Sequence, residues 1–157
     1  MQKITPFLWF NDQAEEAIEF YTAIFNNAKV IETHYLPERQ PGAGKKLMTG
    51  RFQLEGQQFM ALNGGPHFQF SPAISLFVNC ASQSEVDTLW QKLSAGGTEQ
   101  QCGWVTDKFG VSWQIIPKQL GELMGDPNPQ KAQAVMGAMM QMHKINIADL
   151  EQAYNSV

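Results

Sequence analysis

The sequence contains the same arrangement of predicted elements twice, and this internal repeat limits the fold more than any other feature. FLWFN at 7–11 leads into an amphipathic segment that carries Phe20 and Tyr21. ISLFVN at 74–79 leads into a second such segment, which carries Leu89 and Trp90. Strand-like segments follow in both copies. A repeated βαβββ unit predicts an α+β fold, in which antiparallel strands form sheets that carry helices on one face.

Local signals place the elements of the first copy. Asn11 or Asp12 is suited to cap the first helix, whose apolar residues recur at three- and four-residue steps up to Phe25. Glu55-Gly56 between two apolar runs is typical of a tight hairpin. The predicted strands are 4–10, 29–36, 47–54 and 57–62, and 36–46 is predicted to be a surface loop.

The second copy starts after a linker, and a helical tail follows it. Ser82 or Ser84 is suited to cap the second helix, and Gly96-Gly97 to end it. The predicted elements are strands at 73–79, 99–107 and 111–116 and helices at 83–95, 118–124, 129–142 and 146–154. We therefore expect a single domain that comprises module one (1–63), a linker (64–72), module two (73–117) and a helical tail (118–157).

Composition excludes several classes of protein. The formal net charge is -4 and the pI about 5.3, which argues against nucleic-acid binding. No apolar run approaches the length of a membrane span, and the N-terminal residues lack the features of a signal peptide. With only two cysteines, Cys80 and Cys102, we expect reduced thiols and a cytoplasmic protein.

Several segments, in this order, resemble the vicinal-oxygen-chelate superfamily, which includes glyoxalase I, extradiol dioxygenases and bleomycin-resistance proteins. They are ITPFLWFN, AEEAIEFY, DKFGVSWQIIP and the tail AVMGAMMQMHKINIADLEQAY. The chain is most similar to the PhnB-like branch, which also carries the name 3-demethylubiquinone-9 3-methyltransferase. The sequence has no glycine-rich run of the kind that binds a nucleotide-like cofactor, so its motifs do not support methyl transfer.

The resemblance implies that the two modules form a cup of curved mixed or antiparallel sheet. It also implies four metal-ligand positions in this cup, commonly occupied by His and Glu. The first falls on Pro6 and the fourth on Gln114, and neither offers a charged donor. The second falls on Ala61 or Asn63, and the third on Ala73, Ile74 or Ser75. We therefore expect no metal and no cofactor, and catalytic residues are not assigned.

The many aromatic residues on the predicted strands suit a concave site for an apolar or aromatic molecule. The predicted lining residues are Leu8, Phe10, Tyr35, Asn63, His67, Trp104 and Gln114. Three hypotheses follow: a metal-free binding protein for a small molecule, an enzyme with a non-standard site near His67 and Asn63, or an interaction module that acts through the tail. Because methionine is common at adaptable interfaces, the methionine-rich tail predicts a homodimer.

Overall fold

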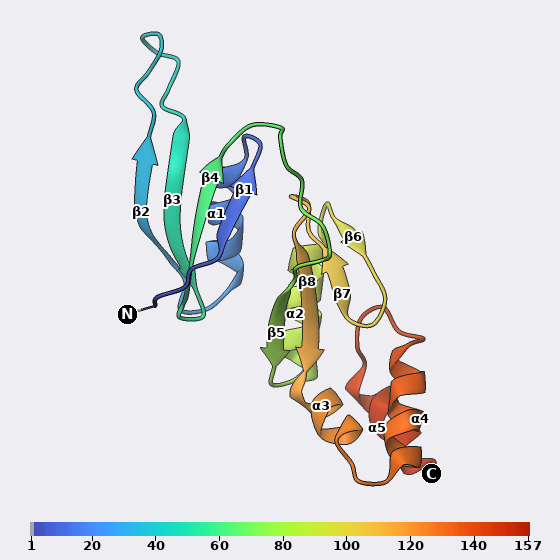
Figure 1. Cartoon of the computed structure of the whole chain (residues 1–157). Coiled ribbons are helices and arrows are strands. Elements are labelled where there is room, and N and C mark those ends of the chain that lie inside the picture. Colours follow the sequence, from blue (N-terminus) through green and yellow to red (C-terminus); the bar gives the residue numbers. More distant parts are fainter. Residues whose placement is uncertain (1) are drawn as a thin grey trace. The chain divides into compact units, whose positions relative to one another are not determined.

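The computed structural model describes residues 2–157 and confirms the α+β class. It divides into two compact units, one ending at Phe70 and the other starting at Ser71. Each unit holds one βαβββ module with a four-stranded mixed sheet, and three further helices belong to the second unit (Figure 1). Among residues 2–157, no helix has the length and apolar character needed to cross a membrane.

The sheet of the first unit has the strand order β1-β4-β3-β2. Its strands are β1 (Phe7–Phe10), β2 (Lys29–Tyr35), β3 (Leu47–Leu54) and β4 (Gln57–Asn63), and helix α1 is Ala14–Ile24. β1 and β4 are parallel, whereas the other neighbours are antiparallel. Glu55 and Gly56 both have positive φ angles, which confirms the predicted tight hairpin between β3 and β4.

Helix α1 packs on one face of this sheet through an aromatic core. Tyr21 stacks on Phe52, and Phe52 stacks on Phe59, with ring centroids 6.3 and 5.4 Å apart. The N-terminal cap differs from the prediction, because Gln13 precedes the helix and makes no side-chain cap. Instead, the Ala14 amide donates 2.8 Å to Oδ1 of Asn63, at the end of β4. A residue distant in sequence thus satisfies the first exposed amide of the helix.

The sheet of the second unit has the order β5-β8-β7-β6, and β5 and β8 are parallel. Its strands are β5 (Leu76–Cys80), β6 (Thr98–Glu99), β7 (Trp104–Thr106) and β8 (Ser112–Pro117), and helix α2 is Gln83–Ser94. Ser82 is the cap of α2, since its hydroxyl accepts from the Glu85 amide at 3.2 Å. Helix α2 buries Val86, Leu89, Trp90 and Leu93.

Two predicted strands of this unit have different limits. The strand expected at 99–107 is divided, because Cys102 and Gly103 have φ angles of 60° and 82° and turn the chain between β6 and β7. The strand expected from Ala73 begins only at Leu76. There the Ser71 hydroxyl accepts from the Ala73 amide at 3.3 Å, which holds a turn where pairing was predicted.

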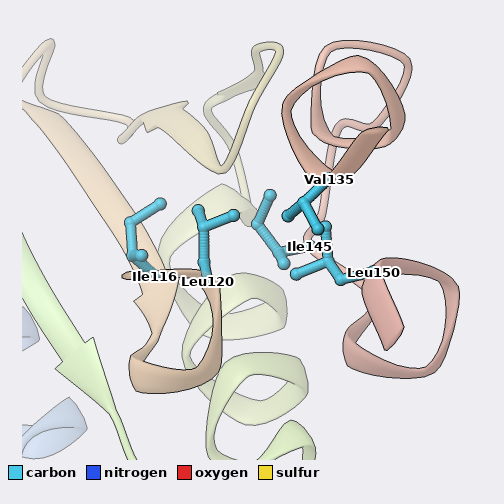
Figure 2. Packing of buried hydrophobic residues seen from close by; sticks show 5 residues of the cluster. All are labelled: Ile116, Leu120, Val135, Ile145 and Leu150. Carbon is cyan, nitrogen blue, oxygen red and sulfur yellow. The ribbon is translucent and has the colours of Figure 1, made fainter. Parts of the chain in front are cut away.

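The tail forms helices α3 (Lys118–Met124), α4 (Pro129–Met139) and α5 (Ile147–Asn155). Helix α4 ends three residues before the predicted limit at 142. Pro129 lies in the first turn of α4, where the backbone N–H that proline lacks would have no partner within the helix. The Asn128 side chain caps this helix. The three helices enclose a small core with Ile116, which Figure 2 shows from close by; its other members are Leu120, Val135, Ile145 and Leu150.

Candidate functional site

The alternation of side chains along β1 decides which of its aromatic residues are accessible. Phe10 is only 3% exposed, and its ring meets Phe70 at 5.2 Å between centroids. Leu8 lies two residues earlier and therefore on the same face, opposite Ala61 on β4, which is fully buried. Both predicted lining residues thus lie on the face that α1 covers, so neither reaches the opposite, open face of this sheet.

Trp9, which the sequence analysis did not select for the site, lies on that open face. Its indole nitrogen donates to the Gly65 carbonyl at 3.0 Å. Phe68 packs edge-on against the indole at a centroid distance of 5.0 Å. A side chain at Gly64 would collide with the indole, so glycine is required there by close approach. The first residues of the linker therefore pack closely against Trp9 of β1.

Both the oxygen and the nitrogen of the Asn63 side-chain amide form hydrogen bonds with the backbone. Besides accepting from Ala14, it donates from Nδ2 to the Leu47 carbonyl at 3.0 Å. It also lines a hollow of about 520 Å³ beside the β2–β3 loop. Arg39 and Lys46 of that loop line the hollow too, and no carboxylate among residues 2–157 does. Asn63 is the only predicted site residue that lines this hollow.

Tyr35 and His67 are both exposed. The Tyr35 hydroxyl donates to Oε1 of Glu15 at 2.9 Å, and this hydrogen bond raises the pKa of the phenol. His67 lies in the linker and makes no hydrogen bond or ion pair with any of residues 2–157. The first unit therefore does not gather its five predicted residues into one pocket.

The second unit brings its two predicted residues together. Gln114 on β8 lies between Trp104 on β7 and Phe77 on β5, as the strand registers show. All three side chains are on the sheet face opposite α2, which we call the open face of the second unit. Gln114 Nε2 donates to the Ser75 hydroxyl at 3.0 Å, which fixes the direction of the amide.

A pocket of about 390 Å³ lies over this open face. Its sheet side consists of Phe77, Asn79, Trp104, Gln114, Ile116 and Pro117, and residues of α3 and α4 also line it. Phe77 is 52% exposed, which is unusual for a phenylalanine and leaves one aromatic face free for a ligand. Cys102 also lines the pocket. The sequence analysis did not select Cys102 for the site, because the position of this residue depends on the turn between β6 and β7.

Two modules of this topology, each a four-stranded mixed sheet with a helix on one face, define the glyoxalase, bleomycin-resistance and dioxygenase class of fold. The model of the 3-demethylubiquinone-9 3-methyltransferase family matches residues 2–116. The chain belongs to this family, in its PhnB-like branch. Comparison with curated proteins finds none that matches.

Several solved structures share the fold of this chain. The PhnB protein of Bacillus cereus, which bears the family description, is 37% identical, with a TM-score of 0.68 over 74% of this chain and 99% of that chain. PA1353 of Pseudomonas aeruginosa shares the fold at 23% identity and a TM-score of 0.63, over 74% and 98%. FosX of Listeria monocytogenes, solved with Mn(II) and sulfate, shares it at 18% and 0.50, over 72% and 90%.

The superfamily that the sequence resembles implies a divalent metal, but the donors of this chain do not fit one. The proline at position 6 has no side-chain donor, and the amide at Gln114 is neutral and already bonded to Ser75. Across residues 2–157, no group of three or more His, Cys, Asp or Glu side chains lies close enough to hold an ion. Divalent ions need charged or imidazole donors to offset the loss of their hydration shell.

Proposed function

We propose that this protein binds a small apolar or aromatic molecule, without a metal, in the pocket over the open face of the second unit. The observation that supports it best is the row Phe77, Gln114 and Trp104, in which two aromatic side chains flank a fixed amide. A volume of about 390 Å³ lies within the range of small-molecule sites. Such sites combine apolar walls with a few oriented polar groups, as here.

The test uses N-phenyl-1-naphthylamine, a neutral dye whose fluorescence rises in apolar surroundings. We expect saturable binding to the full chain. Trp104→Ala should weaken binding at least tenfold, or about 1.4 kcal/mol, because the indole supplies much of the contact area. Phe77→Ala should weaken it as well.

Phe68→Ala is the matched control, since Phe68 is also an exposed phenylalanine, at 65%, but belongs to the first unit. It should leave the affinity unchanged. Dye binding that is insensitive to Phe77 and Trp104 would refute the proposal.

The family name alone does not supply the activity. Binding of a nucleotide-like cofactor usually depends on a glycine-rich turn between a strand and the following helix. Here the turns that follow β1 and β5 are Asn11-Asp12-Gln13 and Ala81-Ser82, which contain no glycine. These turns therefore do not support methyl transfer. The pocket over the open face of the second unit favours binding of a small molecule instead.

A second candidate function is assembly of two copies through the tail. Met136 and Met140 expose 43% and 56% of their surface near the end of α4. Flexible methionine side chains adapt well to a partner surface. The proposal predicts a dimer in size-exclusion chromatography with light scattering, and a monomer for Met136→Lys combined with Met140→Lys. A wild-type monomer at high concentration would exclude it.

A further inference from the structure

The helices α3 to α5 lie beyond the part of the chain that the family model matches. The family model ends at residue 116, and the Bacillus cereus structure covers 74% of this chain while using 99% of its own. The segment 118–157 is here called the extension.

The extension is firmly attached to the second unit. Ile145 and Leu150 are fully buried in the core that it forms with Ile116 (Figure 2). The amides of Cys102 and Gly103 donate to the carbonyls of Met142 and His143, both at 2.8 Å. These two bonds hold the extension against the turn between β6 and β7.

A second attachment joins the extension to α2. The Gln83 side chain donates to the Ile145 carbonyl at 2.9 Å and accepts from the Ile147 amide at 2.8 Å. Lys144 adds an ion pair of 2.9 Å with Asp87. Because strands and α2 both hold it, the extension is a fixed wall of the unit and can shape a binding site.

Five pocket residues come from this wall. They are Lys118, Leu120, Gly121, Met124 and Met139, opposite the aromatic side chains of the sheet. Among residues 2–157, Lys118 is the only charged residue that lines the pocket. The Lys118 side chain is exposed and forms no ion pair with any of residues 2–157.

We infer that the extension makes the pocket selective for an apolar or aromatic molecule that carries one anionic group, which the Lys118 ammonium receives. The inference rests on the proposed function, since it concerns the same pocket. The formal net charge of -4 works against any anion, so a preference for anions has to come from a local cation. Within the pocket lining, only Lys118 is suited to that role.

The test compares two probes of equal size, 2-naphthoate and the neutral 2-naphthamide, by isothermal titration calorimetry on the full chain. We expect 2-naphthoate to bind about fivefold more tightly, as for one partly exposed ion pair. The preference should shrink at high salt because such pairs are screened. Lys118→Gln should abolish it without changing the affinity for 2-naphthamide, and Lys118→Arg should retain it.

Lys92→Gln is the charge-matched control, since Lys92 is exposed in the last turn of α2 and does not line the pocket. It should keep the preference. Equal affinities for the two probes, or a preference that survives in Lys118→Gln, would overturn the inference while leaving the proposed function intact. If neither probe binds at millimolar concentration, the proposed function fails and this inference fails with it.

A second pair of variants tests whether the extension forms the wall. A Cβ atom at Gly121 or at Gly137 would meet nothing within 4 Å, and both glycines are helical, but only Gly121 lines the pocket. Gly121→Leu should therefore fill the pocket and weaken both probes at least tenfold. Gly137→Leu should leave both affinities unchanged. Equal behaviour of the two variants would contradict the assignment of α3 to the wall.

Discussion

The indole nitrogen of Trp113 donates a hydrogen bond of 2.9 Å to Oδ2 of Asp107, and the two residues are 2% and 3% exposed. The other carboxylate oxygen accepts from the amides of Phe109 and Val111, at 2.8 and 3.0 Å. The buried Asp107 carboxylate thus accepts three hydrogen bonds, which stabilise the turn between β7 and β8 and hold the Trp113 indole in place. The motif DKFGVSWQ therefore has a structural role.

Asp107→Ala should lower the free energy of unfolding by at least about 2 kcal/mol, because it leaves buried donors without an acceptor. Asp107→Asn should also destabilise, since its NH2 group would face the indole NH if the amide oxygen keeps the two backbone bonds. Chemical denaturation followed by tryptophan fluorescence measures both. Asp12→Ala, at an exposed position, is the control and should have little effect. An Asp107→Ala protein as stable as the control would contradict this role.

Gly64→Ala should destabilise the first unit by about 1–3 kcal/mol, because the added methyl group has to displace the Trp9 indole. The loss should appear in thermal melting together with a change in tryptophan emission. Gly137→Ala, which adds the same methyl group in open space within α4, should be neutral or stabilise by up to about 1 kcal/mol. A neutral Gly64→Ala would show that Trp9 moves freely.

The two cysteines should react very differently with a thiol reagent. Burial raises the pKa of the Cys80 thiol to about 12, so only about one part in ten thousand is thiolate at pH 8. Cys102 is half-buried and lines the pocket. We expect one thiol per chain to react with Ellman's reagent, none in Cys102→Ser, and slower reaction in the presence of 2-naphthamide. Reaction of Cys80 in the folded protein would contradict this.

The contribution of the Tyr154–Asp126 hydrogen bond, which attaches α5, to the free energy of unfolding should decrease in acid. The Tyr154 hydroxyl donates to Oδ2 of Asp126 at 2.6 Å, and this bond, together with the Asn128 amide, lowers the pKa of Asp126. A lowered pKa in the folded state means that the stabilisation is complete above the ordinary value of about 3.9 and is lost as pH falls through the folded-state pKa.

Tyr154→Phe keeps the ring, over which the Lys131 ammonium lies at 4.1 Å, and removes only the hydroxyl. It should lower the melting temperature at pH 7, and the difference from wild type should shrink near pH 3. An equal difference at both pH values would contradict the charge-assisted bond.

Purified protein should contain no stoichiometric divalent metal after dialysis. The residues at the positions that resemble the superfamily's metal ligands are neutral or inert, Pro6 and Gln114 among them. Gln114→Glu alone should not create a site, because one carboxylate leaves an ion under-coordinated. Elemental analysis tests both statements. About one zinc, iron, nickel or manganese per chain, released by a chelator with a loss of thermal stability, would show that the prediction is wrong.

Local signals in the sequence determined much of the fold. The Glu55-Gly56 hairpin and Pro129 in the first turn of α4 each depend on residues a few positions apart, so the printed sequence was sufficient to predict them. For the α2 cap it offered Ser82 or Ser84, and the structure has Ser82. The repeat of βαβββ units predicted two similar modules, since each copy carries its own pattern, whereas the parallel pairs that make the sheets mixed came from the structure.

The positions of the site residues depended on contacts between residues that are far apart in the sequence. FLWF is apolar at every position, so the alternation does not say which side faces α1, and only packing put Phe10 in the core and Trp9 on the open face. The cap of α1 comes from Asn63, 49 residues away.

The turn at Cys102 interrupts a predicted strand where Met142 and His143, at the far end of the chain, accept its amides. The sequence by itself determined most of the elements and their order, but not the division of this strand into β6 and β7. The tertiary structure decided which faces and amides remain free to form a pocket, because those depend on partners that only folding brings near.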